Sequence, residues 1–251
     1  MVAHDPTAAP LSPTARFTEN ATAIKVGEGL WKSPVKFRSY RLDIIDPQQG
    51  VAAVHAVLDE NGAPILFAGR LKVVDRKITE IETLVAHSQA DAMLFAPANL
   101  NTPSSEMAAT PAAADRMPRE QMVAIALRYP AGLRAGSFVT ADAPFAPNAY
   151  RFENGVRMAG PGCTFQPPSC ENMRTQRIPT LPDVKQRLLA VDEEKGIVLL
   201  YMDFGRGSLP GPDAANKALV TFEAFKIYGG VIHAAEAIFR SAPLGASAGW
   251  E

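Results

Sequence analysis

The sequence is poor in cysteine and in net charge, and each shortage excludes a class of protein. Two cysteines in 251 residues cannot form a disulfide scaffold, and Cys163 and Cys170 lack the second ligand pair of a zinc site. The net charge of −1 leaves no basic field for nucleic acid or for an anionic membrane surface. We therefore expect no nucleic-acid partner, no membrane partner and two free thiols, although a disulfide between the cysteines is sterically allowed.

Metal-ligand and cofactor motifs are also missing. The four histidines, His4, His55, His87 and His233, form no recognised ligand motif with aspartate or glutamate. The glycine-rich loop 205–213 lacks the Gly-Lys-Ser/Thr of a phosphate-binding loop, and neither a Rossmann fingerprint nor a Gly-x-Ser-x-Gly elbow occurs. We expect no metal and no cofactor.

Long apolar runs are absent too, since none approaches the roughly 18 residues that a membrane-spanning helix needs. The first residues lack the charged and apolar regions of a signal peptide, so a cytoplasmic location is the default expectation. A hydrophobic content of 47% with 20% charged residues is instead typical of a packed globular chain. The length suits one large domain or two of about 125 residues.

A repeated hairpin favours two domains. Residues 67–86 form two β-rich runs joined at Asp75-Arg76-Lys77, and residues 222–240 repeat them at a constant offset around Gly229-Gly230. Two shorter runs recur in the same order, residues 13–20 as 147–154 and residues 50–58 as 196–204.

The repeats predict a tandem duplication. We expect a first domain over residues 1–87, a linker rich in alanine, proline, serine and threonine over 88–117, and a second domain over 118–251. Strands of the first domain are expected over 17–25, 30–37, 39–45, 51–58 and 65–74.

The clearest helix runs from Arg119 to Ala135, with Pro118 suited to its first turn and apolar Met122, Ile125 and Ala126 at helical spacing. The first domain shows no equivalent helix. Either the chain starts inside its first domain or a neighbouring subunit covers the exposed sheet, so a homo-oligomer is one expected assembly.

Three motifs in the first half carry a resemblance to a known superfamily. The order Arg-Phe-Thr-Glu-Asn at 16–20, Gly-Glu-Gly-Leu-Trp at 27–31 and the hairpin segment 69–82 resembles the SnoaL-like branch of the nuclear transport factor 2-like superfamily. Residues 16–86, 119–155 and 191–196 together look like an uncharacterised bacterial and fungal domain family with the same two-part layout.

This resemblance implies an α+β fold: two tandem cone-shaped domains, each a curved antiparallel sheet with packed helices and a pocket at its open end. Superfamily members include ketosteroid isomerases, scytalone dehydratases, limonene epoxide hydrolases, polyketide cyclases and some carbon–carbon lyases, which share cofactor-free catalysis. Other members are binding or assembly modules, so the fold by itself does not decide the function.

Polar residues that interrupt apolar strands are the first candidates for catalysis. His55 is the only polar residue in the strand 51–58, and its counterpart in the second copy is Tyr201, which shares a strand face with Asp203. A polar spot at one place in both copies suggests a pocket. The alternative, for each residue alone, is a solvent-exposed face or the interface between the domains.

Arg70 is a further candidate, as an anion stabiliser, and His233 is a weaker candidate base. A cross-strand ladder of Arg70 and Lys72 with two glutamates would explain those charges without any function. Tyr40, Arg41 and Asp43 also include an acid or base, but neighbours on a strand cannot all face inward.

The chemistry compatible with these residues is acid–base catalysis without a cofactor. We expect a lyase, dehydratase or isomerase acting on a hydrophobic, aromatic or polyketide-like small molecule, because positioned acid–base groups contribute about 10²–10⁴-fold in rate. The competing hypothesis is a non-catalytic module that binds a small molecule or takes part in an assembly, supported by the lack of an unmistakable acid–base pair.

Overall fold

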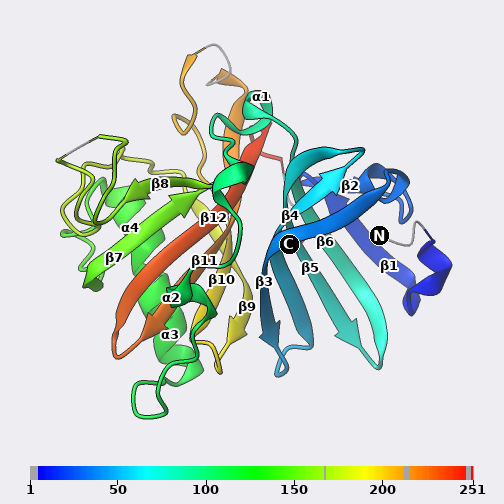
Figure 1. The fold of residues 1–251 in the computed structure, drawn as a ribbon, viewed down its shortest axis with the longest axis horizontal. Coiled ribbons are helices and arrows are strands. Elements are labelled where there is room, and N and C mark those ends of the chain that lie inside the picture. The colour runs from blue at the N-terminus through cyan, green and yellow to red at the C-terminus, as the bar shows by residue number, and fades with distance from the viewer. Residues whose placement is uncertain (1–4, 167, 212–214, 247–249, 251) are drawn as a thin grey trace.

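The computed structural model describes residues 5–166, 168–211, 215–246 and 250, and it contains two six-stranded β-sheets (Figure 1). His4 lies outside the described residues. The first sheet has the order β2-β1-β6-β5-β4-β3. Its strands are β1 (Leu11–Glu19), β2 (Thr22–Ile24), β3 (Val35–Asp46), β4 (Val51–Glu60), β5 (Ala63–Val74) and β6 (Lys77–Ala86).

The second sheet has the corresponding order, β8-β7-β12-β11-β10-β9. Its strands are β7 (Phe145–Glu153), β8 (Val156–Ala159), β9 (Lys185–Asp192), β10 (Ile197–Asp203), β11 (Lys217–Tyr228) and β12 (Val231–Pro243). Both sheets are mixed rather than wholly antiparallel, because β1 runs parallel to β6 and β7 runs parallel to β12. The expectation of antiparallel sheets is wrong at these two pairings.

The hairpins that repeat in the sequence form as expected, and so does the motif before them. Asn20 donates its backbone N–H to the Thr83 carbonyl at 2.8 Å, and its side-chain oxygen accepts the Val85 N–H at 2.8 Å. Asn154 makes the same two kinds of bond with β12. Both asparagines adopt a positive φ, which asparagine tolerates better than most residues. The recurring asparagine therefore ties each first strand to its hairpin.

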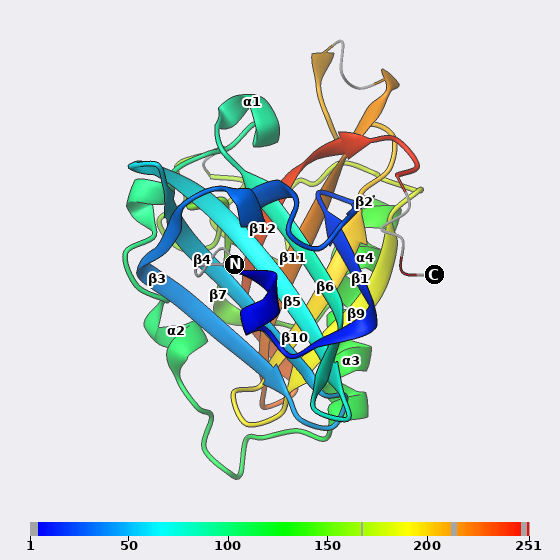
Figure 2. The same cartoon turned by 90° about the vertical axis from the view of Figure 1, so that its right-hand side faces the viewer.

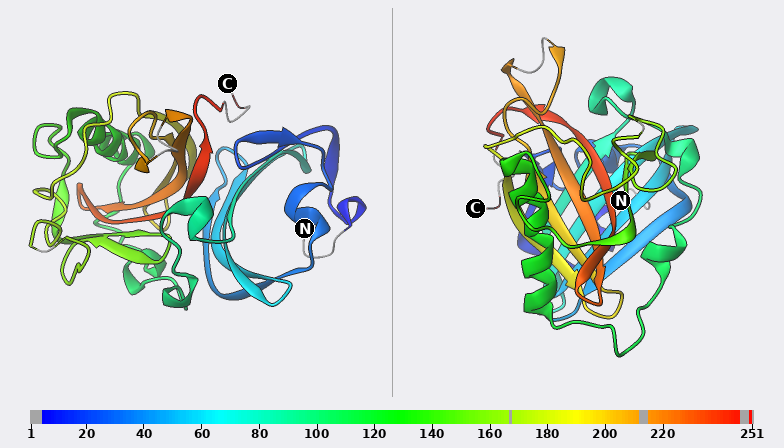
Figure 3. Two further views of the ribbon diagram at one scale, coloured as in Figure 1. Left: turned by 90° about the horizontal axis from the view of Figure 1, so that it is seen from above. Right: turned by 90° about the vertical axis from the view of Figure 1, so that its left-hand side faces the viewer.

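The two sheets pack back to back, so that their concave faces point away from each other (Figure 3). Alternate residues of β4, Val51, Ala53 and Val57, pack in one apolar cluster with Ile197 and Leu199 of β10. The convex faces are therefore buried between the sheets, and each concave face is left for other contacts.

Two aspartates at the ends of β3 and β9 form a reciprocal contact across this interface. The Val191 N–H donates to Asp46 Oδ2 at 2.8 Å, and the Ile45 N–H donates to Asp192 Oδ2 at 3.0 Å. Asp46 also receives two bonds from the Arg119 guanidinium, at 3.0 and 2.6 Å. Exchange of the same contact in both directions is what a twofold relation between the sheets produces, and it supports the duplication, which stays a prediction.

Helices cover the concave face of the second sheet. The expected helix over 119–135 forms as two, α3 (Arg119–Ala126) and α4 (Arg128–Ala135), joined at Leu127. The break has a local cause, since Pro130 has no N–H and its ring would clash with the Ala126 carbonyl in a continuous helix. In the described part of the chain, the concave face of the first sheet has only short turns beside it, η1 (Pro6–Ala8) and η2 (Gly29–Lys32).

The segment between the sheets is packed rather than loose. It contains α1 (Gln89–Ala92), η3 (Pro97–Asn99) and α2 (Ser105–Ala108). Met107 is fully buried in the core between the sheets, and the Asn154 side chain donates to the Leu94 carbonyl at 2.9 Å. Within the described residues, no helix is both long enough and apolar enough to span a membrane.

Two expectations from the sequence are corrected here. Cys163 and Cys170 form a disulfide, because the loop between β8 and β9 folds back and brings their Cα atoms to 5.9 Å. Disulfides are typical of oxidising compartments, so the bond does not favour the expected cytoplasmic location, which stays a prediction. Residues 30–37 are not one strand, since Gly29–Lys32 form a 3₁₀ turn before β3 begins at Val35.

We predict that Asp46→Ala destabilises the protein more than Asp192→Ala. Loss of Asp46 leaves the partly buried Arg119 guanidinium without its carboxylate, at a cost of about 3 kcal/mol, whereas loss of Asp192 removes backbone hydrogen bonds worth about 1–3 kcal/mol. Urea denaturation measures both. Arg174→Ala, which removes an exposed ion pair with Asp142, is the control at about 0–1 kcal/mol. Equal effects of all three changes would contradict the importance of the reciprocal contact.

Candidate functional site

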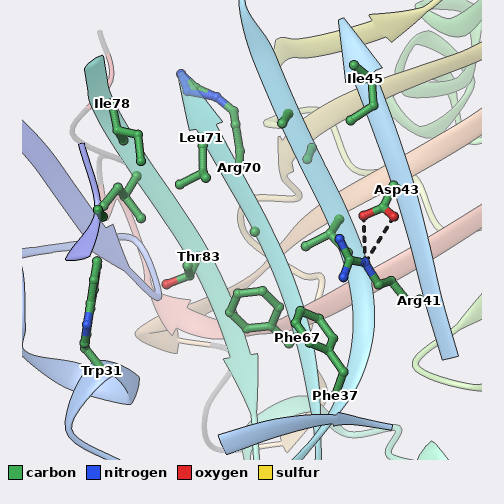
Figure 4. Close-up of a pocket in the computed structure, with 16 residues that line it drawn as sticks. Trp31, Phe37, Arg41, Asp43, Ile45, Phe67, Arg70, Leu71, Ile78 and Thr83 are labelled. Carbon is green, nitrogen blue, oxygen red and sulfur yellow. Dashed lines mark hydrogen bonds and ion pairs between the residues drawn. The ribbon is translucent and has the colours of Figure 1, made fainter. Parts of the chain in front are cut away.

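The concave face of the first sheet, which faces the viewer in Figure 2, holds a cavity of about 510 Å³ that we call the cup (Figure 4). Large apolar side chains make up most of its wall. They are Trp31, Phe37, Ile45, Val54, Phe67, Leu71, Ile78 and Ile81. Phe37 and Ile45 stay 42% and 44% exposed, so the cup presents apolar surface to solvent that no described residue covers. Contiguous exposed apolar surface of this kind marks a binding site more often than a plain surface.

Trp31 closes one end of the cup because of a local turn. The Leu30 N–H donates to both oxygens of the Glu19 carboxylate, at 3.2 and 3.1 Å, which fixes the 3₁₀ turn against β1. Gly29 has φ +60° and lies so close to Glu19 that an added Cβ would collide with its carboxylate. The glycine therefore allows the turn that carries Trp31 to the cavity.

The charged groups of the cup are concentrated in one ion pair on β3. Arg41 Nε donates to both oxygens of Asp43, at 2.9 and 3.1 Å, and the guanidinium lies over the Phe37 ring at 4.7 Å (Figure 4). No described protein group hydrogen bonds to Nη1 or Nη2 of Arg41. Thr83 adds one hydroxyl to the wall, and this hydroxyl donates to the Thr18 carbonyl at 3.4 Å. A ligand would thus meet an apolar wall, the Arg41–Asp43 pair with two guanidinium nitrogens free of described hydrogen bonds, and Arg70, which is paired with Glu80.

His55 and Tyr201 lie between the two sheets, on the faces opposite the concave ones. His55 shares its strand face with Val51, Ala53 and Val57 and is fully buried, and neither ring nitrogen has a described partner. Burial lowers the pKa of His55 to about 3. The Tyr201 hydroxyl is likewise buried without a described hydrogen-bond partner, and burial raises its pKa. The alternation of the strands is as expected, but the sequence does not reveal which face is concave.

The other candidates are held by nearby groups. Arg70 pairs with Glu80 and approaches Glu82 at 3.8 Å, as expected for the cross-strand ladder of charges. Arg70 also lines the cup. Asp203 accepts the Gly205 N–H at 2.9 Å and so fixes the turn after β10. His233 stacks on Tyr228 with ring centres 3.5 Å apart.

The catalytic role of these five residues stays a prediction, and the structure does not bring them together in one cavity. The cup instead contains Arg41 and Asp43. These two residues ranked low in the sequence because Tyr40, Arg41 and Asp43 cannot all point to one face of a strand. Tyr40 does point to the interface, where it donates to Glu236 at 3.2 Å. The signal in the sequence was the Arg-x-Asp spacing itself, which places both charges on one face.

Comparisons with known proteins find one family model over part of the chain and a weakly similar solved structure. Residues 115–239, just under half of it, match the model of a domain of unknown function, DUF8021. A crystal structure of an NTF2-like protein of unknown function from Cytophaga hutchinsonii ATCC 33406 is similar at 14% identity, over 32% of this chain and 71% of that chain, with a TM-score of 0.26. No curated protein matches the chain. Membership of the nuclear transport factor 2-like superfamily therefore stays an expectation.

We predict that His55 makes the protein less stable in mild acid. Burial lowers the pKa of His55 from 6.5 to about 3. Between these two pH values His55 is protonated in the unfolded state and neutral in the folded state. Stability then falls by about 1.4 kcal/mol for each pH unit below 6.5, and this loss continues towards pH 3. Urea denaturation of wild type and His55→Leu between pH 7 and pH 4.5 measures the difference.

The His55→Leu variant should lose this part of the pH dependence, whereas His87→Leu, at an exposed position, should keep it. Parallel stability curves for wild type and His55→Leu would contradict the assignment of a neutral, buried His55.

Proposed function

We propose that the protein binds a hydrophobic, aromatic or polyketide-like small molecule in the cup and acts on it as a cofactor-independent acid–base enzyme, a lyase, dehydratase or isomerase. The observation that carries the proposal is the cup itself, an apolar cavity of about 510 Å³ whose charged groups are concentrated in the Arg41–Asp43 pair. Cavities of this size hold small molecules of drug-like dimensions.

The walls favour a flat, apolar ligand. Trp31, Phe37 and Phe67 offer ring faces and edges, and the guanidinium of Arg41 already stacks on Phe37. Aromatic ligands gain from such contacts beyond the area that they bury. A ligand oxygen would be drawn to the two Nη groups of Arg41.

The same pair supports proton transfer. Asp43 would remove a proton from a carbon beside a carbonyl group, the electron pair of the C–H bond would move onto the carbonyl oxygen, and Arg41 would stabilise the resulting enolate. Return of the proton to a different carbon gives isomerisation, and loss of a leaving group from the enolate gives a lyase or dehydratase reaction.

Blocking the cup tests the binding half of the proposal. We predict that Val54→Trp, which places a large ring in the cavity, abolishes the fluorescence enhancement of the aromatic anion 1-anilinonaphthalene-8-sulfonate. Val73→Trp is the matched control, because Val73 is exposed on the neighbouring strand and does not line the cup. Circular dichroism confirms that both variants fold. Equal dye binding by the two variants would place the dye elsewhere.

Replacement of the base tests the catalytic half. We predict that the protein catalyses exchange of the acidic C–H protons of 2-tetralone, a bicyclic aromatic ketone, in D₂O, and that Asp43→Asn slows this exchange about 10²-fold or more. Asp59→Asn is the control, because Asp59 forms a similar ion pair with Arg38 outside the cup. Proton NMR follows the exchange.

The competing function is a non-catalytic binding module, and it makes a different prediction. In that case the dye binds in the cup, Val54→Trp blocks it, and the wild-type protein exchanges no ketone protons faster than buffer does. The 40% exposure of the Asp43 side chain favours this alternative, because an exposed carboxylate is a weaker base than a desolvated one.

A further inference from the structure

The second sheet holds a smaller cavity of about 230 Å³ on its own concave face, which we call the chamber. It lies among α4, β7 and the segment between β8 and β9 that contains the Cys163–Cys170 disulfide. Its apolar part includes Leu133, Ile178 and Phe204. Its wall also carries a buried charged cluster, centred on Arg151.

The cluster joins α4, β7 and β11. Arg151 Nη1 donates to the Tyr129 hydroxyl at 3.0 Å, and Arg151 Nε lies 2.9 Å from Glu153. Tyr129, Arg151 and Glu153 all line the chamber. Glu223 faces Tyr129 and Arg151 from β11, is 1% exposed, and its Oε1 has no hydrogen-bond partner among the described residues. A buried carboxyl oxygen without a partner is costly, so it calls for an explanation.

The fold does not need these charges, as the first sheet shows. By strand register, the position of Glu223 between β10 and β12 corresponds to that of Gly69 between β4 and β6 in the first sheet. In the same way, the position of Arg151 beside β12 corresponds to that of Phe17 beside β6. The same strand positions are therefore filled by glycine and phenylalanine in one sheet and by a glutamate and an arginine in the other. A purely structural role does not account for a buried cluster that the equivalent sheet lacks.

The donors in the wall outnumber the negative charges. Arg177 lies at the exposed side of the chamber and has no described ion-pair partner, and the side-chain amide of Gln166 adds a further donor. The hydroxyls of Ser169 and Ser208 already donate to backbone carbonyls. Arg151 keeps its Nη2 free of described hydrogen bonds. We propose that the chamber is a second binding site, for a small carboxylate whose apolar body packs on Leu133 and Phe204 and whose charged end meets Arg151 and Arg177.

Glu223 makes this binding dependent on pH. Burial, and next the charge of Glu153, raise its pKa to about 8, while Arg151 and the hydrogen bond from Tyr129 oppose the rise. Tyr129 on α4 and Arg151 and Glu153 on β7 are the titratable groups that act on it. At pH 7 Glu223 is mostly neutral, and Arg151 can accept an anionic ligand. Above pH 8 Glu223 ionises and repels the carboxylate.

The test uses benzoate as the probe and isothermal titration calorimetry on the whole protein. Benzoate binds at pH 7 and its dissociation constant is about tenfold weaker at pH 9, since only the neutral form of Glu223 is competent. Benzamide, which has the same shape and no charge, does not bind. In Glu223→Gln the affinity at pH 9 equals that at pH 7, while Glu171→Gln, an exposed change in the same segment, behaves as wild type.

Mutation of two arginines on one loop distinguishes binding in the chamber from nonspecific attraction of benzoate to positive charge. Arg177→Gln weakens benzoate binding, whereas Arg174→Gln does not, because Arg174 is exposed and pairs with Asp142 outside the chamber. Val54→Trp, which blocks the cup, leaves benzoate binding intact, so the test of the chamber does not depend on the function proposed for the cup. Absence of benzoate binding, equal affinity of the wild type at both pH values, or loss of binding in Val54→Trp would each overturn the proposal.

Discussion

The structure depends on the burial of two convex sheet faces against each other, held in register by Asp46 and Asp192. Each aspartate accepts a backbone N–H from the other sheet, and Asp46 also binds Arg119 at the start of α3. Apolar packing alone is not directional and would let the sheets slide. The reciprocal hydrogen bonds fix one arrangement, and that arrangement leaves both concave faces pointing outward (Figure 3).

The two concave faces differ in the size and polarity of their cavities because different elements cover them. In the second sheet, α3 and α4 bring Met122, Ala126 and Leu133 onto the face, and the chamber beside them is the smaller cavity. In the first sheet no described helix does so, and a wide apolar cup remains. One strand plan thus produces a hydrophobic site with one exposed ion pair and a tighter site with a buried charged cluster. These are different chemical environments, which is why the two proposed sites are expected to bind different small molecules.

Much of the architecture was predictable because it rests on local patterns. The hairpins, the turn at Gly229-Gly230 and the helical span after Pro118 follow from turn chemistry and periodicity. The candidate site was harder to predict. The alternation that groups His55 with Val51 and Ala53 is correct, yet the same pattern fits a strand whose polar residue faces a pocket and one whose polar residue faces another sheet. Glu223 interrupts an apolar strand as His55 does, but its counterpart in the first copy is Gly69, so the comparison of the two copies did not select it.

The sequence by itself determined the strands, their hairpins and the recurrence of Asn20 as Asn154, because these depend on residues close in the chain or on one strand face. Tertiary structure alone decided which face is concave, that Cys163 meets Cys170, and that Glu223 lies beside Arg151 and Tyr129 of the chamber wall. The direction of sheet curvature and the meeting of distant segments arise from packing between elements. Packing of this kind depends on the whole chain at once, so no local pattern encodes it.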